Sequence, residues 1–390
     1  MEAHQKIKTN WEKDSHLNRL FQALKAGGGT PRLVGGVVRD TILGIPQDDY
    51  DIAINQTPLS ATQSLKSAAI SVIPTGIDHG TVTAVVDGHP YQITSLRTDL
   101  KTDGRRAEVA FTEDWVLDAA RRDFTINALY ADLDGTIYDP FQGLADLAAH
   151  CVRFIGDPEA RIQEDYLRIL RFFRFSAAYG KGQLHRPSLD ACKKLARHVQ
   201  MLAKERITQE FFKLLKAPYA TQVLKVMVDT GVLKEFLPSP FDIQGMQNLR
   251  DNFESDALLN LAAAQVLPEV VFLSFRLSNE EKFRYKKMFA TETVVSGNMQ
   301  KLLYLHGPQA VSDWLKLQGN REQSFFEKVE SYERPTFPLN GQDLIDRGIN
   351  GPAIGKYLKQ VEAWWIDSDF SKDRKACLNH LDQLLANKGS

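Results

Sequence analysis

Apolar residues in the first third of the chain recur at two spacings. Residues 10–26 carry apolar side chains at helical intervals, and three consecutive glycines at 27–29 end that pattern. Shorter runs with strand or helix character follow, and together they predict a small mixed sheet with helices on one side. The predicted strands are 32–34, 50–54, 81–86 and 90–96, and the predicted helices are 36–43 and 59–69.

From about residue 143 the strand patterns disappear. Long segments with helical periodicity take their place, which predicts helices packed on helices. Prolines at 238–240, 307–308 and 335–338 divide the later part into shorter helical pieces. The clearest helical patterns lie at 157–179, 188–197, 205–216 and 219–230.

Two glycines follow the first predicted strand. Gly35 and Gly36 come directly after Val34 and open the next predicted helix, with Arg39 one turn inside it. A turn without side chains lets the backbone approach a phosphate, and the first N–H groups of a helix favour an anion. A guanidinium one turn in can bind the same phosphates. The segment therefore predicts a phosphate-binding turn.

Two carboxylates stand close to that turn. Asp49 and Asp51 are two residues apart at the start of a predicted strand, so we expect them on one face of the sheet. Paired carboxylates are ligands that Mg²⁺ prefers. Either feature alone is common in proteins, but a glycine turn followed by two such carboxylates predicts a metal-dependent nucleotide site.

A series of motifs resembles the class II tRNA nucleotidyltransferases, which are the CCA-adding enzymes, and the related bacterial poly(A) polymerases. The motifs occur in family order and cover roughly the first 215 residues well. They are Gly35-Gly36-Val37-Val38-Arg39-Asp40, Asp49-Tyr50-Asp51, the nine residues from Arg121 to Leu129, Asp139-Pro140-Phe141, Glu164-Asp165-Tyr166-Leu167-Arg168 and Glu205-Arg206-Ile207.

The resemblance implies an α+β protein in several parts. A polymerase-β-like nucleotidyltransferase head with a small mixed sheet would occupy residues 1–142. A helical neck that recognises the nucleotide base would follow at 143–217, and a helical body and tail that bind tRNA at 218–390.

The resemblance also implies a reaction, in which the 3′-hydroxyl of an RNA attacks the α-phosphate of a nucleoside triphosphate. Asp49 and Asp51 would be the catalytic residues and would bind Mg²⁺. Family members often have a glutamate in the following strand, where this chain has the uncharged Gln92. This chain therefore offers a neutral amide where those family members have a third carboxylate.

The triplet Arg121-Arg122-Asp123 would form an ordinary surface ion cluster in many proteins. By resemblance, Arg122 instead contacts the triphosphate, and Asp123 accepts a hydrogen bond from the ribose hydroxyl. Asn127 belongs to the same nucleotide-binding group, together with Gly35, Gly36 and Arg39.

Asp165 and Arg168 are three residues apart, and on a helix they would be neighbours. An ordinary surface ion pair is one interpretation. Cytosine and adenine, however, both present an amino donor beside an unprotonated ring nitrogen, whereas uracil and guanine present a carbonyl beside an N–H. A carboxylate beside a guanidinium complements the first pair and opposes the second. The two residues thus predict base selection without a nucleic-acid template.

Further basic residues are assigned less directly. By resemblance, Arg171 and Arg174 belong to the nucleotide pocket. Residues 98–107 are predicted to be a flexible basic loop between two strands, and residues 350–356 to begin a helix suited to a phosphate. Residues 151–217 hold 14 Lys and Arg against 7 Asp and Glu, so we expect a localised RNA footprint. The predicted RNA-binding residues are Arg105, Arg106, Lys193, Lys194 and Lys356.

The composition indicates the cellular location that we expect for this protein. The chain has 390 residues, of which 43% are hydrophobic and 25% charged, with a net charge of −1. Its 3 cysteines are widely spaced and predict neither disulfides nor zinc. No run spans a bilayer and residues 1–12 lack a secretory core, so we expect a cytoplasmic protein without a membrane or an obligate protein partner.

We therefore predict addition or repair of the 3′-terminal CCA of tRNA, with CTP, ATP and Mg²⁺. The alternatives are a poly(A) polymerase, whose family members tend to carry a long basic C-terminal extension that this chain lacks, and an enzyme that adds only CC or only A. A different class is an RNA-binding relative without catalysis. Intact Asp49 and Asp51 argue against that last class.

Overall fold

The computed structural model describes all residues except 48, 104–105, 291–292, 296 and 387–390. The chain divides into two compact units. The first holds Met1–Ile243 and Leu273–Arg276, and the second holds Gln244–Phe272 and Leu277–Ser390. The three-part division into head, neck and body with tail stays a prediction.

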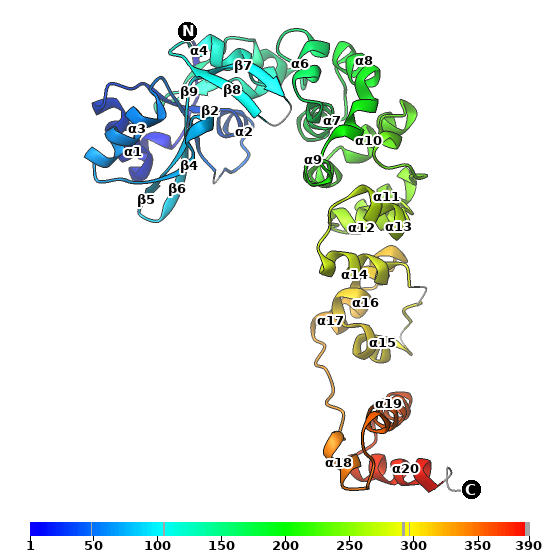
Figure 1. The fold of residues 1–390 in the computed structure, drawn as a ribbon. Coiled ribbons are helices and arrows are strands. Elements are labelled where there is room, and N and C mark those ends of the chain that lie inside the picture. The colour runs from blue at the N-terminus through cyan, green and yellow to red at the C-terminus, as the bar shows by residue number, and fades with distance from the viewer. Residues whose placement is uncertain (48, 104–105, 291–292, 296, 387–390) are drawn as a thin grey trace. The chain divides into compact units, whose positions relative to one another are not determined.

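A mixed sheet forms the head of the first unit (Figure 1), with the strand order β1-β10-β9-β2-β3-β6-β5-β4 among the described residues. Most neighbours are antiparallel, but β3 and β6 are parallel. The strands are β1 (Ala3–Lys6), β2 (Pro31–Val34), β3 (Asp51–Ile54), β4 (Ser71–Gly76), β5 (Thr81–Val86), β6 (His89–Ser95), β9 (Tyr130–Ala131) and β10 (Thr136–Tyr138).

Two helices cover one face of this sheet. α1 (Ser15–Ala26) and α3 (Pro58–Ser67) contact each other and the strands. Leu17, Leu20 and Leu24 are fully buried at helical spacing on α1, and Ile52 and Ile93 are buried on the strands. Asp14 caps the start of α1 by accepting hydrogen bonds from two backbone N–H groups. The alternation on the strands and the periodicity on α1 therefore build one core layer.

The predicted loop at 98–107 is wrong in its secondary structure. β7 (Arg97–Asp103) and β8 (Arg106–Phe111) pair as antiparallel strands in a separate sheet. Polar and charged residues alternate poorly with apolar ones in this segment, and that composition hid the strand character. Pairing across two strands supplies hydrogen bonds that sequence patterns do not reveal.

The rest of the first unit is helical. The predicted helix at 157–179 is wrong as one element, because it breaks at Asp165 and Tyr166. Short 3-10 helices lie at Trp11–Lys13, Ile77–His79, Thr125–Asn127, Ala196–Met201 and Leu233–Glu235. The α-helices are α2 (Gly36–Ile42), α4 (Trp115–Ala120), α5 (Gly143–Ala148), α6 (Pro158–Glu164), α7 (Leu167–Tyr179), α8 (Arg186–Leu195), α9 (Lys204–Lys216) and α10 (Ala220–Asp229).

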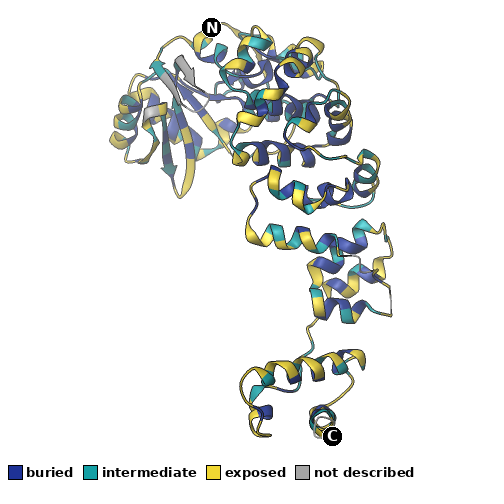
Figure 2. Ribbon diagram, turned by 45° about the vertical axis from the view of Figure 1, so that its right-hand side comes forward, coloured by how far each residue is buried: buried dark blue, intermediate teal, exposed yellow. Residues whose placement is uncertain are grey.

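Helices continue as far as Ala386, and past β10 the described residues contain no further strand. These helices carry both buried and exposed positions, as Figure 2 shows. These helices are α11 (Ile243–Arg250), α12 (Ala257–Ala263), α13 (Pro268–Ser274), α14 (Asn279–Met288), α15 (Met299–His306), α16 (Pro308–Leu317), α17 (Gln323–Glu330), α18 (Gly341–Ile345), α19 (Pro352–Asp367) and α20 (Arg374–Ala386).

The predicted fold class is confirmed: a small mixed sheet comes first and helices follow. None of the helices in the described ranges is both long and apolar enough to cross a membrane.

Candidate active site

A cavity of about 620 Å³ lies in the first unit, between the head and the helices that follow it. Several segments that are distant in sequence supply its walls, and most of the side chains are charged. The lining residues are Gly35, Gly36, Arg39, Asp51, Arg97, Arg121, Arg122, Asp123, Asn127, Asp165, Leu167, Arg168, Arg171, Phe175 and Arg206.

The glycine turn forms one wall of the cavity. Gly35 has φ 72° and ψ −120°, a backbone conformation that side chains disfavour. A Cβ atom added there would stand 3.6 Å from Arg122 Nη1 and 3.6 Å from the carbonyl oxygen of Asn127. Glycine thus allows the turn to join β2 to α2 with its backbone open to the cavity.

Arg39 lies behind this turn and is largely engaged within the protein. Its guanidinium donates to both carboxylate oxygens of Asp40 at 2.8 Å, to Asn127 Oδ1 at 2.5 Å and to the Tyr179 hydroxyl at 2.6 Å. It also stacks over the Tyr179 ring, with its carbon 4.0 Å from the ring centre. Few of its donors are left for a phosphate, so Arg39 ties α7 to the glycine turn.

The two predicted metal ligands do not lie in the same element. Asp51 is the first residue of β3 and lines the cavity, whereas Asp49 lies in the preceding loop. β3 covers Asp51 but not Asp49, so the shared face of the two carboxylates stays a prediction. Burial raises the pKa of Asp51, and the negative charge of Asp49 raises it further, while Arg122 opposes both effects.

The donor set fits a hard cation. Two carboxylates that disfavour each other's charge would be relieved by a divalent ion between them. Gln92 is the cross-strand partner of Asp51 in the parallel pair of β3 and β6, so an amide stands beside this carboxylate. Within the described part of the chain, no group of three or more His, Cys, Asp and Glu side chains is placed to hold a metal.

Arg122 is fixed by a residue that the sequence analysis missed. Asp118 on α4 binds Arg122 at 3.1 Å and Arg121 at 2.7 Å, and it accepts the Tyr130 hydroxyl at 2.7 Å. Burial opposes the ionised form of Asp118, but the two guanidinium groups and the hydroxyl lower its pKa to about 2. Its position three and four residues before the arginines on a helix was the available signal.

Asp123 and Arg171 form a second buried pair. Arg171 reaches one oxygen of Asp123 at 2.6 Å, and the other oxygen accepts from Asn127 Nδ2 at 3.0 Å and from the Phe124 N–H at 2.9 Å. Burial alone would raise the pKa of Asp123, yet Arg171 and these hydrogen bonds hold it below its ordinary value. The Asp123 carboxylate therefore stays ionised at the cavity wall.

Asp165 and Arg168 both line the cavity, but they are not neighbours on one helix. Asp165 ends α6 in an extended conformation, with φ −156° and ψ 107°, and Arg168 lies in the first turn of α7. The Arg168 N–H donates to the Asp165 carbonyl oxygen at 3.0 Å, but the two side chains bind other partners. Asp165 binds Arg206 of α9 at 2.7 Å instead, and Arg168 binds Glu164 at 2.5 Å.

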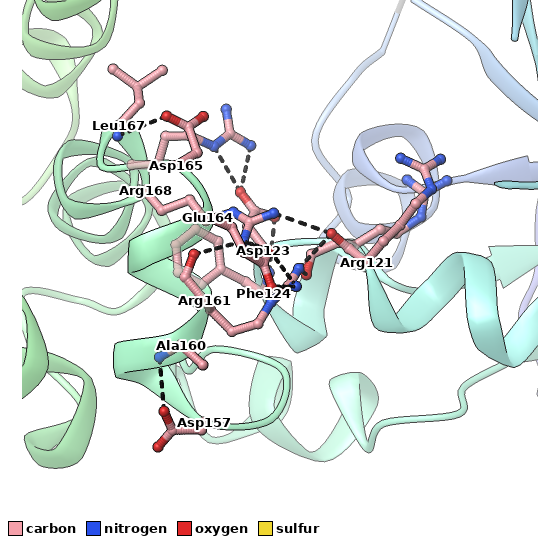
Figure 3. A network of polar contacts seen from close by, with 12 residues as sticks. Arg121, Asp123, Phe124, Asp157, Ala160, Arg161, Glu164, Asp165, Leu167 and Arg168 are labelled. Atoms are coloured by element: carbon pink, nitrogen blue, oxygen red, sulfur yellow. Dashed lines mark hydrogen bonds and ion pairs between the residues drawn. The ribbon is translucent and has the colours of Figure 1, made fainter. Parts of the chain in front are cut away.

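Two arginines link this helix break to the head (Figure 3). Arg161 donates to the carbonyl oxygens of Arg121 at 2.5 Å and Arg122 at 2.7 Å, and to Glu164. Arg168 donates to the Arg121 carbonyl at 3.2 Å. The backbone that carries Arg122 and Asp123 is thus held by side chains of α6 and α7.

Arg174 lies behind the cavity wall. It binds the buried Glu210 of α9 at 2.5 Å, and Arg171 stands 3.6 Å from the other oxygen of the same carboxylate. The predicted pocket residues therefore include one, Arg174, that supports the wall without lining it. The predicted site residues do not include Arg97, Arg121, Arg161, Arg206 or Glu210. Arg206 and Glu210 bind side chains 41 and 36 residues away, which no local spacing indicates.

The predicted RNA-binding residues are scattered. Arg105 lies outside the described residues, as does the side chain of Arg106. Lys193 and Lys194 are exposed on α8, and Lys194 binds Glu159 at 2.6 Å. Lys356 is exposed in the second unit, near the start of α19. Their role in RNA binding stays a prediction.

Comparison with known proteins identifies the family. Residues 31–153 match the poly(A) polymerase head domain, and residues 183–242 match a region described as a probable RNA- and SrmB-binding site of polymerase A. The CCA-adding enzyme of Leuconostoc citreum (strain KM20) is 38% identical, and the match covers 98% of this chain and 99% of that protein. The chain belongs to the CCA-adding enzyme family.

Relatives in this family come from bacteria and from mitochondria. The mitochondrial CCA tRNA nucleotidyltransferase 1 of Mus musculus is 34% identical to this chain, over 90% of this chain and 86% of its own length. The resemblance read from the motifs is confirmed. The predicted cytoplasmic location stays a prediction, since the family includes mitochondrial members.

Solved CCA-adding enzymes share the fold. The Bacillus stearothermophilus enzyme in complex with CTP superposes with a TM-score of 0.79 at 23% identity, covering 98% of this chain and 99% of that one. The Thermotoga maritima enzyme complexed with tRNA gives a TM-score of 0.66 at 20% identity, covering 99% and 100%. The likeness extends from the head through the helical remainder of the chain.

Proposed function

We propose that this protein adds CMP and AMP to the 3′ end of tRNA and so builds or repairs the terminal CCA. One observation carries the proposal: a single cavity brings together Asp51, the glycine turn, Arg122, Asp123 and Asp165. These residues come from the motifs that the family shares. Relatives that match nearly the whole chain are named as CCA-adding enzymes.

In each cycle the 3′-hydroxyl oxygen of the RNA forms a bond to the α-phosphorus of CTP or ATP. The bond from that phosphorus to the bridging oxygen breaks, its electrons leave with pyrophosphate, and the hydroxyl proton is released. Such transfers depend mainly on positioning and on neutralising charge. The cavity supplies Arg122 for the triphosphate, and the open backbone at Gly35 and Gly36 lets the phosphates approach closely.

Asp49 and Asp51 would hold Mg²⁺ at the edge of the cavity. The ion would supply positive charge to the α-phosphate and lower the pKa of the attacking hydroxyl. The raised pKa of Asp51, which comes mainly from desolvation and in smaller part from Asp49, supports this assignment. Gln92 would offer at most a neutral amide oxygen, so the site would rest on two carboxylates.

Asp123 would read the sugar. Its carboxylate is ionised and is fixed in orientation by Arg171, Asn127 and the Phe124 N–H. The lone pairs that remain free to accept a hydrogen bond are therefore fixed in direction as well. A ribose hydroxyl could donate to it, whereas a deoxyribose could not. Asp123 would therefore favour ribonucleotides.

Asp165 and Arg168 would read the base, with Arg206 fixing the direction of the Asp165 carboxylate. Asp165 offers acceptors, and guanidinium donors stand on the same cavity wall. This arrangement complements the amino group and ring nitrogen shared by cytosine and adenine. Arg171 would hold the Asp123 carboxylate in place. Arg174 would hold the Glu210 carboxylate, whose other oxygen lies 3.6 Å from Arg171.

The test uses tRNA transcripts that end before the CCA, after the first C and after CC. Each is incubated with one nucleoside triphosphate at a time, and product lengths are read on a sequencing gel. We expect two C additions, then one A addition, then arrest. Continued A addition would identify a poly(A) polymerase, C addition alone or A addition alone would identify a partial enzyme, and no extension would identify an RNA-binding relative.

A further inference from the structure

The open face of the head sheet carries a row of side chains that starts at Asp51. The strand register aligns Asp51 of β3 with Gln92 of β6, Gln92 with Thr83 of β5, and Thr83 with Ile73 of β4. Residues aligned in this way across adjacent strands point to the same face of a sheet. The row therefore extends from the proposed catalytic carboxylate to the edge strand.

This face differs from the opposite one. Gln92 and Ile73 are exposed and Thr83 is half-buried, whereas the intervening Ile93 and Val82 are buried on the side covered by α1 and α3. The hydroxyls of Thr83 and Thr75 lie 2.8 Å apart, and those of Thr81 and Thr94 in the adjacent row lie 3.1 Å apart. Between Asp51 and the apolar Ile73 at the edge strand, the aligned side chains of the open face are thus uncharged hydrogen-bonding groups.

An exposed aromatic ring stands beside these rows. Phe111 of β8 is 42% exposed, and its ring would lie 2.9 Å from a Cβ atom added at Gly80, the residue before Thr81. Across the strand pair, Phe111 is aligned with Arg97, which lines the cavity. The ring therefore lies near both the hydroxyl-rich face and the rim of the nucleotide cavity.

Strand order puts the glycine turn and Gln92 on opposite sides of Asp51. β2, which leads into Gly35, neighbours β3 on one side, and β6, which carries Gln92, neighbours it on the other. In phosphoryl transfer the attacking and leaving oxygens lie roughly in line, on opposite sides of the phosphorus. With the triphosphate at the glycine turn, the β6 side of Asp51 is the side on which an in-line attacking hydroxyl would lie.

We propose that the open face of β6, β5 and β4, together with Phe111, binds the 3′-terminal nucleoside of the RNA. The proposal rests on the nucleotidyl transfer proposed above. Neutral amide and hydroxyl groups suit ribose hydroxyls rather than phosphates. An exposed phenylalanine ring suits a base, because every base offers a face for stacking.

The test measures steady-state A addition to a tRNA transcript ending in CC, with wild type and three variants. Phe111→Leu keeps a large apolar side chain and removes the aromatic face, and Thr83→Val removes one hydroxyl at nearly constant shape. Leu59→Ala is the matched control, because Leu59 is 69% exposed on α3, which packs on the other face of the sheet. Thermal unfolding of each variant reports on folding.

We expect Phe111→Leu to raise KM for the transcript about five- to tenfold, as loss of one stacked base predicts. KM for ATP should not change. Thr83→Val should raise KM for the transcript less, and Leu59→Ala should leave both constants unchanged. A transcript whose terminal nucleotide lacks its base should bind wild type and Phe111→Leu equally weakly. Removing the base and removing the ring abolish the same contact, so the second change should add nothing to the first.

Unchanged KM for the transcript in Phe111→Leu and Thr83→Val, with wild type active, would overturn the proposal and leave the proposed reaction standing. An equal effect of the missing base on wild type and on Phe111→Leu would also overturn it, because the ring would then not contact the base. An inactive wild type would instead contradict the proposed reaction itself.

Discussion

Asp165 binds Arg206, a residue 41 positions further along the chain, through both carboxylate oxygens at 3.2 and 2.7 Å. The Leu167 N–H also donates to this carboxylate at 3.1 Å. Asp165 lies where the helix is interrupted, so its carboxylate is held from two directions at the cavity wall. A group that reads a base edge needs this kind of fixed direction.

Arg206→Gln should weaken base selection without removing the carboxylate. Loss of the charged partner would let the Asp165 carboxylate turn away, and we expect the preference for CTP and ATP over UTP and GTP to fall roughly tenfold. Single-turnover rates with each triphosphate measure it. Arg186→Gln is the control, since Arg186 forms an exposed pair with Asp190. Equal losses in both variants would contradict the positioning role of Arg206.

Asp118→Asn should destabilise the first unit in a pH-dependent way. The pKa of Asp118 falls from 3.8 to about 2 on folding, so its contribution of roughly 2 kcal/mol is present above pH 4 and disappears as the pH falls toward 2. The difference in unfolding free energy between wild type and variant, from urea denaturation, should therefore shrink over this range. A difference that stays constant from pH 6 to pH 2.5 would contradict it.

Changes at Asp51 and Gln92 should move metal affinity in opposite directions. Asp51→Asn removes one proposed ligand, and Gln92→Glu places a third carboxylate beside Asp51. Calorimetric titration with Mg²⁺ or Mn²⁺ should give weaker binding in the first variant and tighter binding in the second. Asp51→Asn should also abolish addition of both C and A, while tRNA binding stays near wild type. Unaltered ion affinity in both variants would remove the metal assignment.

Asp123→Ala should relax sugar selection. The carboxylate is proposed to accept the ribose hydroxyl, so the ratio of dNTP to NTP incorporation in competition assays should rise more than tRNA affinity falls. Arg171 loses its partner in this variant, so some decrease in stability is expected as well. Asp123→Asn, which keeps the shape, should shift the sugar ratio in the same direction. Unchanged ratios of dNTP to NTP incorporation in both variants would contradict the proposed role of Asp123 in sugar selection.

Much of the fold, and part of the candidate site, could be predicted from local sequence motifs. The strands at β2, β3, β5 and β6 and the glycine turn follow from hydrophobic alternation and from the demands of a left-handed backbone at Gly35. Contacts across long sequence distances could not be predicted this way. Arg206 and Glu210 lie on α9, yet they bind side chains of the preceding helices, and no local spacing encodes that pairing.

The break at Asp165 shows the same limit. Apolar periodicity continues through 157–179, and it predicts one helix because α6 and α7 both bury their apolar faces. The interruption is stabilised by Arg206 from another helix, and by Arg161 and Arg168 on carbonyl groups of the head. Tertiary hydrogen bonds therefore override a continuous local pattern at the place where base recognition is proposed.

The most direct measurement of base selection by protein side chains uses Asp165→Ala. Single-turnover rates with CTP, ATP, UTP and GTP are compared with wild type on transcripts ending before CCA and after CC. We expect discrimination against UTP and GTP to fall by roughly 1–3 kcal/mol, while ion affinity changes little. Wild-type discrimination in the variant would contradict it and leave Asp165 as a structural partner of Arg206.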